Sequence, residues 1–292
     1  MSHKSGFVNI LGNPNAGKST LMNAAIGEKL SIITAKAQTT RHRIMGIANG
    51  DDYQIVYSDT PGIVNPHYKL HESMMGFVHS ALKDADVFLL VTDIGEDFKN
   101  QDILDKVKES CIPTIIVINK IDLSDQETVE QKIQYWRDKF ESAEIIPVSA
   151  LLKFNIEKVI DSILVKLPDS PPYFPKDELS DKTMRFFASE IIREKIFENY
   201  QKEIPYACEV VVESYKEEVH IDKISATIFV ERESQKGIVI GHKGSALKKV
   251  GTESRIDIED FVQKKVFLEL HVKVNKDWRN NDTFLKRFGY DI

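Results

Sequence analysis

Near the start of the chain, Gly12 to Ser19 combine glycines, a lysine and a serine at a spacing that suits phosphate binding. The segment is Gly-Asn-Pro-Asn-Ala-Gly-Lys-Ser, and its glycines let the backbone bend so that successive N–H groups face an anion. Lys18 would reach the β- and γ-phosphates of a nucleotide, and the Ser19 hydroxyl would hold Mg²⁺. The alternative is a plain turn between a strand and a helix. The complete spacing favours a phosphate-binding loop.

Two elements must flank such a loop, and the sequence supplies both. An apolar run at residues 7–11 predicts a buried strand before the loop, and residues 20–26 predict the start of a helix after it. The N-terminal end of that helix would add its positive dipole to the site. We therefore expect nucleotide contacts along the whole loop, from Gly12, Asn13, Pro14, Asn15, Ala16, Gly17, Lys18, Ser19 and Thr20.

Runs rich in Val, Ile, Leu and Phe alternate with amphipathic stretches, which is typical of an α/β domain with a mostly parallel sheet covered by helices. The turn at residues 49–52 predicts that one edge strand is antiparallel. We predict six strands, at residues 7–11, 44–48, 54–58, 87–91, 114–118 and 144–148. Because ligands bind at the carboxyl ends of the strands in such sheets, function is expected in the residues that follow each strand.

Three polar stretches follow these predicted strands. Asp59-Thr60-Pro61-Gly62 follows the third, where the carboxylate can hold a Mg²⁺-bound water and the Gly62 N–H can reach the γ-phosphate. Asn119-Lys120-Ile121-Asp122 follows the fifth, and a carboxylate there can accept from guanine N1–H and the N2 amine, a pair that adenine lacks. Ser149-Ala150-Leu151 follows the sixth and can offer a backbone N–H to guanine O6. The sequence thus predicts a guanine-nucleotide site, although the Asn–Asp stretch alone could be an ordinary helix cap.

With the polar segment 37–43, these stretches resemble in order and position the G1 to G5 motifs of a translation-factor-class GTPase. The segment has no clear period, which suits a mobile part that nucleotide orders. In such GTPases a threonine here completes the Mg²⁺ shell; the family pattern favours Thr40, and Thr39 is the competing assignment. The resemblance implies that Ser19, Thr40 and Asp59 bind Mg²⁺, and that the catalytic residues are Lys18, Thr40, Asp59 and Asn15.

One position departs from the best-known GTPases. Ile63 stands where many have a glutamine that orients the attacking water, and an aliphatic side chain cannot do so. We expect slow intrinsic hydrolysis, and we count Ile63 among the residues beside the nucleotide. The resemblance to other GTPases with a hydrophobic residue here implies that Asn15 helps to bind a K⁺ ion in place of an arginine finger. The alternative is that Asn15 only shapes the loop.

Length and composition set further bounds. A chain of 292 residues is long enough for two domains, each with its own core. No apolar run approaches the ~18 residues of a membrane span, and the N-terminus lacks the apolar segment of a signal peptide. Cys111 and Cys208 lie far apart, which favours reduced thiols in a cytosolic protein. The formal charge of −6 comes from the part before residue 180, so nucleic-acid binding would depend on a local patch.

Residues 167–180 contain four prolines and predict a semi-rigid, extended linker. This linker divides the chain into a GTP-binding domain at residues 1–166 and a second domain at residues 181–292. The second domain opens with an amphipathic stripe, Met184, Phe187, Ala188 and Ile191, and continues with three alternating strands. These patterns predict a small α+β module.

Between the second and third of those strands lies Gly241-His242-Lys243-Gly244, flanked by apolar helical segments. It resembles the loop of a KH domain, which clamps single-stranded nucleic acid backbone, and the order of elements suits the type II arrangement. No acid occurs between Lys236 and Lys249, so the lysines there form a local positive patch. A plain helix-to-helix turn is the alternative. The predicted RNA contacts are Lys236, Gly237, Ile240, Gly241, His242, Lys243, Gly244, Ser245, Lys248 and Lys249.

One GTPase domain followed by one KH domain resembles the Era family of bacterial GTPases over essentially the whole chain. The resemblance implies Mg²⁺-dependent GTP hydrolysis and binding to the 3′ end of 16S ribosomal RNA during 30S subunit assembly. It also implies a monomer in the cytoplasm, sometimes at the inner membrane face. A Der-like GTPase is disfavoured because only one phosphate loop is present, and a tRNA-modifying relative because the terminal cysteine motif is missing. Two alternatives remain: a scaffold with a structural nucleotide, and a GTPase whose second domain recruits a protein.

Overall fold

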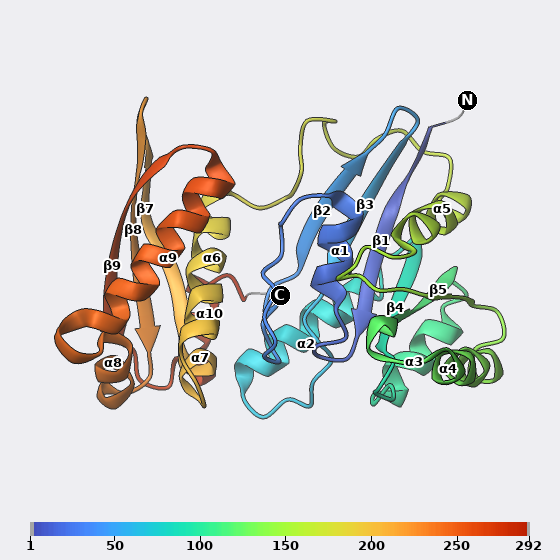
Figure 1. The fold of residues 1–292 in the computed structure, drawn as a ribbon, viewed down its shortest axis with the longest axis horizontal. Coiled ribbons are helices and arrows are strands. Elements are labelled where there is room, and N and C mark those ends of the chain that lie inside the picture. Colours follow the sequence, from blue (N-terminus) through green and yellow to red (C-terminus); the bar gives the residue numbers. More distant parts are fainter. Residues whose placement is uncertain (1–2, 291–292) are drawn as a thin grey trace. The chain divides into compact units, whose positions relative to one another are not determined.

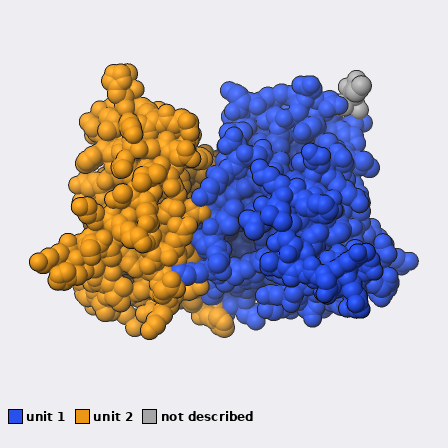
Figure 2. Space-filling model, viewed as in Figure 1, with its two compact units in different colours: residues 1–66, 71–181, 292 blue, residues 67–70, 182–291 orange. Residues whose placement is uncertain are grey.

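The computed structural model describes residues 3–290, which fall into two compact units (Figures 1 and 2). Unit 1 holds the chain up to Pro66 together with His71–Asp181, and unit 2 holds His67–Leu70 together with the chain from Lys182 on. No helix among residues 3–290 is long and apolar enough to cross a membrane.

Unit 1 is built on a six-stranded sheet in the order β2-β3-β1-β4-β5-β6, in which only β2 and β3 pair antiparallel. The predicted mixed sheet with one antiparallel edge strand is therefore confirmed. Each observed strand overlaps its predicted range. The strands are β1 Lys4–Gly12, β2 Ile44–Asn49, β3 Tyr53–Asp59, β4 Val87–Asp93, β5 Thr114–Asn119 and β6 Glu144–Pro147.

Helices cover both faces of this sheet. The helices α2, α3 and α4 share one apolar cluster with the sheet, centred on the fully buried Trp136, and α1 and α5 contact each other on the opposite face (Figure 1). Burial on both faces explains why every residue of β5 is buried and only its two end residues are polar. The helices are α1 Lys18–Ile26, α2 Lys69–Ala81, α3 Gln101–Glu109, α4 Gln126–Lys139 and α5 Ile156–Lys166.

The proline-rich segment that we predicted as a linker is docked along the outer strands of unit 1. Buried Gln54 of β3 accepts from the backbone N–H groups of Tyr173 and Phe174, at 2.7 and 3.0 Å. The Ile47 N–H of β2 donates to the carbonyl of Leu179 at 2.9 Å, and Ser180 forms a β-bridge with Gly46. The segment therefore belongs to unit 1 by its contacts, as far as Asp181.

Unit 2 is an α+β module around the sheet β7-β8-β9, in which β7 and β8 pair antiparallel and β8 and β9 parallel. Helices α6 and α9 pack over one face and close the core (Figure 1). The elements are α6 Met184–Asn199, α7 Ile204–Ala207, β7 Glu209–Glu217, β8 Ile221–Val230, α8 Glu233–Ile240, α9 Ser245–Val262, β9 Lys265–Val274 and α10 Asp282–Arg287. This is the small α+β domain that the sequence predicts.

The C-terminal tail packs against unit 2. Trp278 is fully buried and donates from Nε1 to the carbonyl of Ala207 at 3.0 Å. Its ring meets Phe288, which also contacts Phe229 of β8. Asn281 caps α10 by accepting from the backbone N–H groups of its first turn. The aromatic residues of the tail therefore pack within unit 2.

Candidate nucleotide and RNA sites

A cavity of about 440 Å³ opens at the carboxyl end of the unit 1 sheet, where the predicted motifs converge. Its volume suits a nucleotide-sized ligand. The predicted residues that line it are Pro14, Asn15, Gly17, Lys18, Ser19, Thr20, Thr40, Gly62, Asn119, Lys120, Asp122 and Leu151. The remaining predicted residues support it from behind. Thr60, for example, is buried and donates to the Ile10 carbonyl at 2.6 Å.

Lys18 reaches back over the loop that precedes it. Its ammonium donates to the carbonyls of Gly12 and Asn13 at 3.1 and 2.9 Å, and only 6% of the residue is exposed. Burial lowers the pKa of this lysine from 10.5 to about 8, and the nearby Asp59 carboxylate acts in the opposite direction. The Lys18 ammonium is buried, and the carbonyls that it contacts carry no full negative charge. Such a group favours a strongly anionic ligand such as a polyphosphate.

Ser19, Thr40 and Asp59 form a compact oxygen cluster beside this lysine. The Ser19 hydroxyl donates to Asp59 Oδ2 at 2.6 Å and lies 2.9 Å from Thr40 Oγ1. Asp59 is fully buried, its pKa is raised by burial, and its Oδ1 has no hydrogen-bond partner among the described residues. Two hydroxyls and a buried, under-satisfied carboxylate are the hard oxygen ligands that Mg²⁺ prefers. The cluster therefore fits this ion.

The two candidate threonines lie in different surroundings. Thr40 Oγ1 is in the oxygen cluster, whereas Thr39 Oγ1 donates to the Lys36 carbonyl at 2.8 Å and contacts Thr34 at 2.6 Å. Arg43 holds the end of this segment, because its guanidinium forms an ion pair with Asp84 at 2.7 Å and donates to Ser58 Oγ at 2.6 Å. Our sequence analysis did not assign this arginine a role.

Asn119 joins three of the predicted motifs. Its Nδ2 donates to the Ala16 carbonyl in the phosphate loop at 2.9 Å, and its Oδ1 accepts from the Ala150 N–H at 3.0 Å. Of the three residues from which we expected a backbone N–H for guanine O6, Ala150 thus already uses its N–H within the protein. The Leu151 residue lines the cavity and is 75% exposed. In this stretch, it is Leu151 that faces the ligand space.

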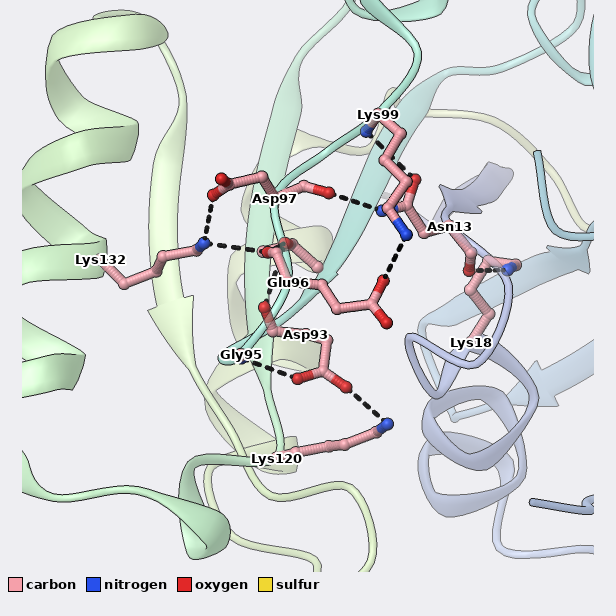
Figure 3. A network of polar contacts seen from close by, with 10 residues as sticks. Asn13, Lys18, Asp93, Gly95, Glu96, Asp97, Lys99, Lys120 and Lys132 are labelled. Carbon is pink, nitrogen blue, oxygen red and sulfur yellow. Dashed lines mark hydrogen bonds and ion pairs between the residues drawn. The ribbon is translucent and has the colours of Figure 1, made fainter. Parts of the chain in front are cut away.

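A second network, which we had not predicted, supports the loop and the base-recognition motif from the side (Figure 3). Asn13 donates from Nδ2 to the Asp97 carbonyl at 2.8 Å, which ties the phosphate loop to the segment after β4. Asp93, the last residue of β4, pairs with Lys120 at 2.6 Å, and Lys132 of α4 pairs with Asp97 at 2.9 Å. The end of β4 and the loop after it therefore position Lys120 and Asn13.

Ile63, which stands where many GTPases have a water-orienting glutamine, points into the protein interior. Ile63 is 7% exposed and packs in the apolar cluster with Leu11 and Met75, so its side chain lies in the core. Asn15 sits at the surface of the loop with a left-handed φ of 62°, and its Nδ2 donates to the Ala35 carbonyl at 3.3 Å. The amide oxygen of Asn15 receives no hydrogen bond from the described residues, which leaves an oxygen ligand at the loop.

Part of the cavity wall escaped the sequence analysis. It comes from the segment between α1 and β2 and from the turn after β5, which show no clear hydrophobic period. The lining residues that we did not predict are Ile32, Ile33, Thr34, Ala35 and Leu123. Gln38 and Thr39, which also line the cavity, lie in the polar segment 37–43 that we expected nucleotide to order.

In unit 2 the Gly-x-x-Gly loop lies between α8 and α9, as predicted. Gly241 and Gly244 adopt φ values of +72° and +80°, and a short 3-10 turn at His242–Gly244 links the helices. The side chains His242, Lys243, Lys248 and Lys249 are exposed, whereas Lys236 and Ile240 are half-buried. The loop therefore presents glycine backbone and lysine ammonium groups to solvent, which suits a phosphate backbone.

Comparison with known proteins agrees with both sites. Residues 7–120 match the family described as 50S ribosome-binding GTPase, and residues 203–279 match the KH domain family. The chain is 46% identical to GTPase Era of Syntrophus aciditrophicus over 292 residues, which cover 99% of this chain and 95% of that protein.

Two solved structures resemble the chain along almost its full length. One is a crystal structure of Era in complex with MgGDPNP and nucleotides 1506–1542 of 16S ribosomal RNA. The other is a variant of Aquifex aeolicus Era bound to GDP.AlF4⁻. Each has a TM-score of 0.95 and 38% sequence identity, and each alignment covers 99% of this chain and 100% of the other.

Proposed function

The chain belongs to the Era family of GTPases, and we propose that it binds 16S ribosomal RNA near the 3′ end and acts in 30S subunit assembly. The observation that supports this most directly is the meeting of Lys18, Ser19, Asp59 and Asn119 around one cavity in unit 1. The exposed lysines of the Gly-x-x-Gly loop support the RNA half of the proposal.

We propose that Lys18 exchanges its two carbonyl partners for the β- and γ-phosphate oxygens of GTP. Its burial strengthens that attraction, because no water competes for the ammonium. Ser19, Thr40 and Asp59 would hold Mg²⁺, which neutralises charge on the phosphates when it is bound. The ion would face the Asp59 Oδ1 atom that lacks a hydrogen bond, and its charge would favour the ionised form whose pKa burial raises.

For the base, we propose that Asp122 accepts from guanine N1–H and N2 while the Leu151 N–H reaches O6. Asn119 acts as a positioning residue, since both of its amide atoms are bonded within the protein. Lys120 is turned into place by its ion pair with Asp93 and by its left-handed φ of 64°. Its alkyl stem can then cover one face of the base.

The Ile63 side chain is buried and cannot orient the attacking water. A group other than residue 63 must therefore do so. We propose that K⁺ bound by the Asn15 amide oxygen adds positive charge near the β- and γ-phosphates. The surface position of Asn15 and its unused oxygen support this. Equal phosphate release in Na⁺ and K⁺ buffers would rule it out, and Asn15→Ala should remove any difference between the two ions.

Nucleotide state is expected to act on RNA binding through the segments that hold Thr40 and Asp59. The affinity of the full chain for RNA, measured with a GTP analogue and with GDP, tests this coupling. Identical affinities would contradict the coupling and leave hydrolysis untouched. A monomeric state, a cytoplasmic location and a visit to the inner membrane face stay predictions.

The decisive experiment has two arms. Phosphate release by Lys18→Ala, in Mg²⁺ and K⁺ with RNA present, should fall about 10³-fold, because one preorganised charge is lost. A scaffold with a structural nucleotide would release no phosphate even as the unaltered protein. Crosslinking to total RNA and sequencing what is recovered should return the 3′ region of 16S RNA. Lys243→Glu with Lys248→Glu should weaken that signal strongly, whereas the signal would not change if the second domain recruits a protein instead of RNA.

A further inference from the structure

The sheet of unit 2 has a second face that α6 and α9 do not cover. The even-numbered residues of β9, such as Leu268 and Leu270, pack in the core, so its odd-numbered residues point the other way. The C-terminal tail covers this outer face only at one end, where Phe229 meets Phe288. The residues that β9 exposes on the outer face are Lys265, Phe267, Glu269, His271 and Lys273.

One row across this outer face joins two lysines and a phenylalanine. Lys216 of β7 lies directly opposite Lys223 of β8, and Lys223 lies beside Phe267 of β9. Phe267 is 56% exposed, and Lys216 forms no ion pair within residues 3–290. The row therefore presents two ammonium groups and an aromatic ring to solvent side by side.

The charge around this row is mainly positive. Lys265 begins β9 next to the row and pairs with Glu259 of α9 at 3.5 Å. Lys273 lies further along the same strand with no ion pair among the described residues. Glu269 is the one acid that β9 presents on this face, and Glu218 in the β7–β8 turn pairs with Lys223 at 2.8 Å. Polar Ser214 and Ser225 fill the next row.

We infer that this outer face binds RNA, with its lysines on backbone phosphates and a base stacked on Phe267. Lysines set around an exposed aromatic ring match a ligand that offers anions and flat rings together. An acidic protein would use the lysines and leave the ring without a specific partner. The inference rests on the proposed RNA-binding function and extends it to a second surface.

This surface is separate from the Gly-x-x-Gly loop. The loop lies at the start of α9, whereas Lys265 and Phe267 follow its end, and α9 has 18 residues. A helix of that length spans about 27 Å. Figure 1 shows α8 and the β7–β8 turn at opposite ends of unit 2. A strand of about four nucleotides clamped by the loop cannot reach the row, so only longer RNA would touch both.

The test compares two RNA probes on the full chain. The long probe is nucleotides 1506–1542 of 16S ribosomal RNA, and the short probe is its last ~4 nucleotides, the number that a KH loop clamps. For the long probe, Lys216→Glu with Lys223→Glu should lower the slope of log affinity against log salt by about 1.4, at about 0.7 per phosphate contact. Phe267→Ala should weaken the long probe about tenfold through lost stacking. Neither variant should alter affinity for the short probe.

The control is Lys158→Glu with Lys202→Glu, which changes the net charge equally at exposed positions outside this face. It should leave the slope unchanged. If the face variants bind the long probe as the unaltered chain does, the inference is overturned, and a protein or membrane partner takes its place. Equal losses for both probes would also overturn it, as would a lowered melting temperature that accounts for the loss. If the unaltered chain binds neither probe, the proposed RNA function itself fails.

Discussion

Gly17 of the phosphate loop and Gly244 of the Gly-x-x-Gly loop adopt similar left-handed backbones, with φ of +89° and +80°. Their surroundings differ sharply. A Cβ at Gly17 would lie 2.1 Å from Nδ2 of Asn119, whereas a Cβ at Gly244 would meet nothing within 4 Å. At Gly17 a side chain would both strain the backbone and collide with Asn119. At Gly244 a side chain would strain the backbone and obstruct a ligand that approaches from solvent.

The charged groups of the two sites follow the same division. Lys18 and Asp59 are buried in unit 1, and their pKa values are shifted by burial. Lys243 and Lys248 of unit 2 stand in solvent. A buried site holds its charges at a cost in stability and uses them for chemistry, whereas an exposed site attracts phosphate through a field that salt screens. Four substitutions or conditions test this contrast.

The largest effect is expected at the base-recognition end of the buried site. Asp122→Asn replaces an acceptor by a donor that faces guanine N1–H, so GTP affinity should fall about 10⁴-fold. Xanthosine triphosphate, whose 2-carbonyl accepts where guanine donates, should bind in its place. Calorimetry with GTP and with xanthosine triphosphate measures this change in specificity. Asp125→Asn is the matched control, because Asp125 only caps α4 and asparagine caps equally well. Equal losses in the two variants would contradict the assignment.

The glycine contrast predicts the next largest effect. Gly17→Ala combines left-handed strain with a collision at Asn119, together about 2–5 kcal/mol, so nucleotide affinity should fall at least about thirtyfold. Gly244→Ala meets open space and should cost only the ~1–2 kcal/mol of backbone strain. Nucleotide titration and RNA titration of both variants give the comparison. Similar losses of each site's own ligand would show that conformation alone matters at both loops.

The effect of Lys243→Glu with Lys248→Glu on salt dependence should also differ between the two sites. Removal of two phosphate contacts by Lys243→Glu with Lys248→Glu should lower the salt slope of RNA binding by about 1.4. Between about 0.05 and 0.2 M salt, RNA affinity of the unaltered chain should therefore fall about sevenfold more than that of the variant. GTP affinity of the variant should match that of the unaltered chain at each salt concentration. A change in GTP affinity would break the contrast.

The smallest effect concerns pH. Without ligand the buried Lys18 has a pKa of about 8, and bound phosphates should raise that pKa again. Nucleotide binding then takes up a proton, so affinity should fall about fivefold between pH 8 and 9. Calorimetry at pH 8 in two buffers of different ionisation enthalpy should count about half a proton taken up. Proton release, or no exchange, would show that burial does not shift this lysine as described.

The same pKa shift has a consequence for folding. The pKa of Lys18 is lower in the folded chain than in the unfolded chain, so the unfolded chain binds more protons between pH 8 and 10.5. In that interval the contribution of Lys18 to stability rises with pH. Asp59, whose pKa is raised by burial, contributes in the opposite sense above pH 3.8. Bound nucleotide and Mg²⁺ would pair these two charges and remove the destabilisation that their burial causes.

The strands and motifs were predictable because local sequence determines them. The runs of β4 and β5 are continuously apolar, and the carboxyl ends of parallel strands place Asp59 and Asn119 near Lys18 whatever the loops do. The contacts of Asn13 with Asp97 and of Lys120 with Asp93 were not predictable, since each joins positions that only tertiary structure brings together. For the same reason the docking of Tyr173 on Gln54 could not be read from a proline-rich stretch.

That docked stretch has a consequence for how unit 1 can be isolated. β2 is an outer strand, and its open side is occupied by the chain around Leu179 and Ser180. A fragment that stopped at residue 166 would uncover backbone N–H and C=O groups that could recruit β2 of another copy. A fragment that continued to Asp181 would keep the edge of β2 covered. Residues 167–181 thus prevent self-association through the exposed edge of the sheet as well as connecting two domains.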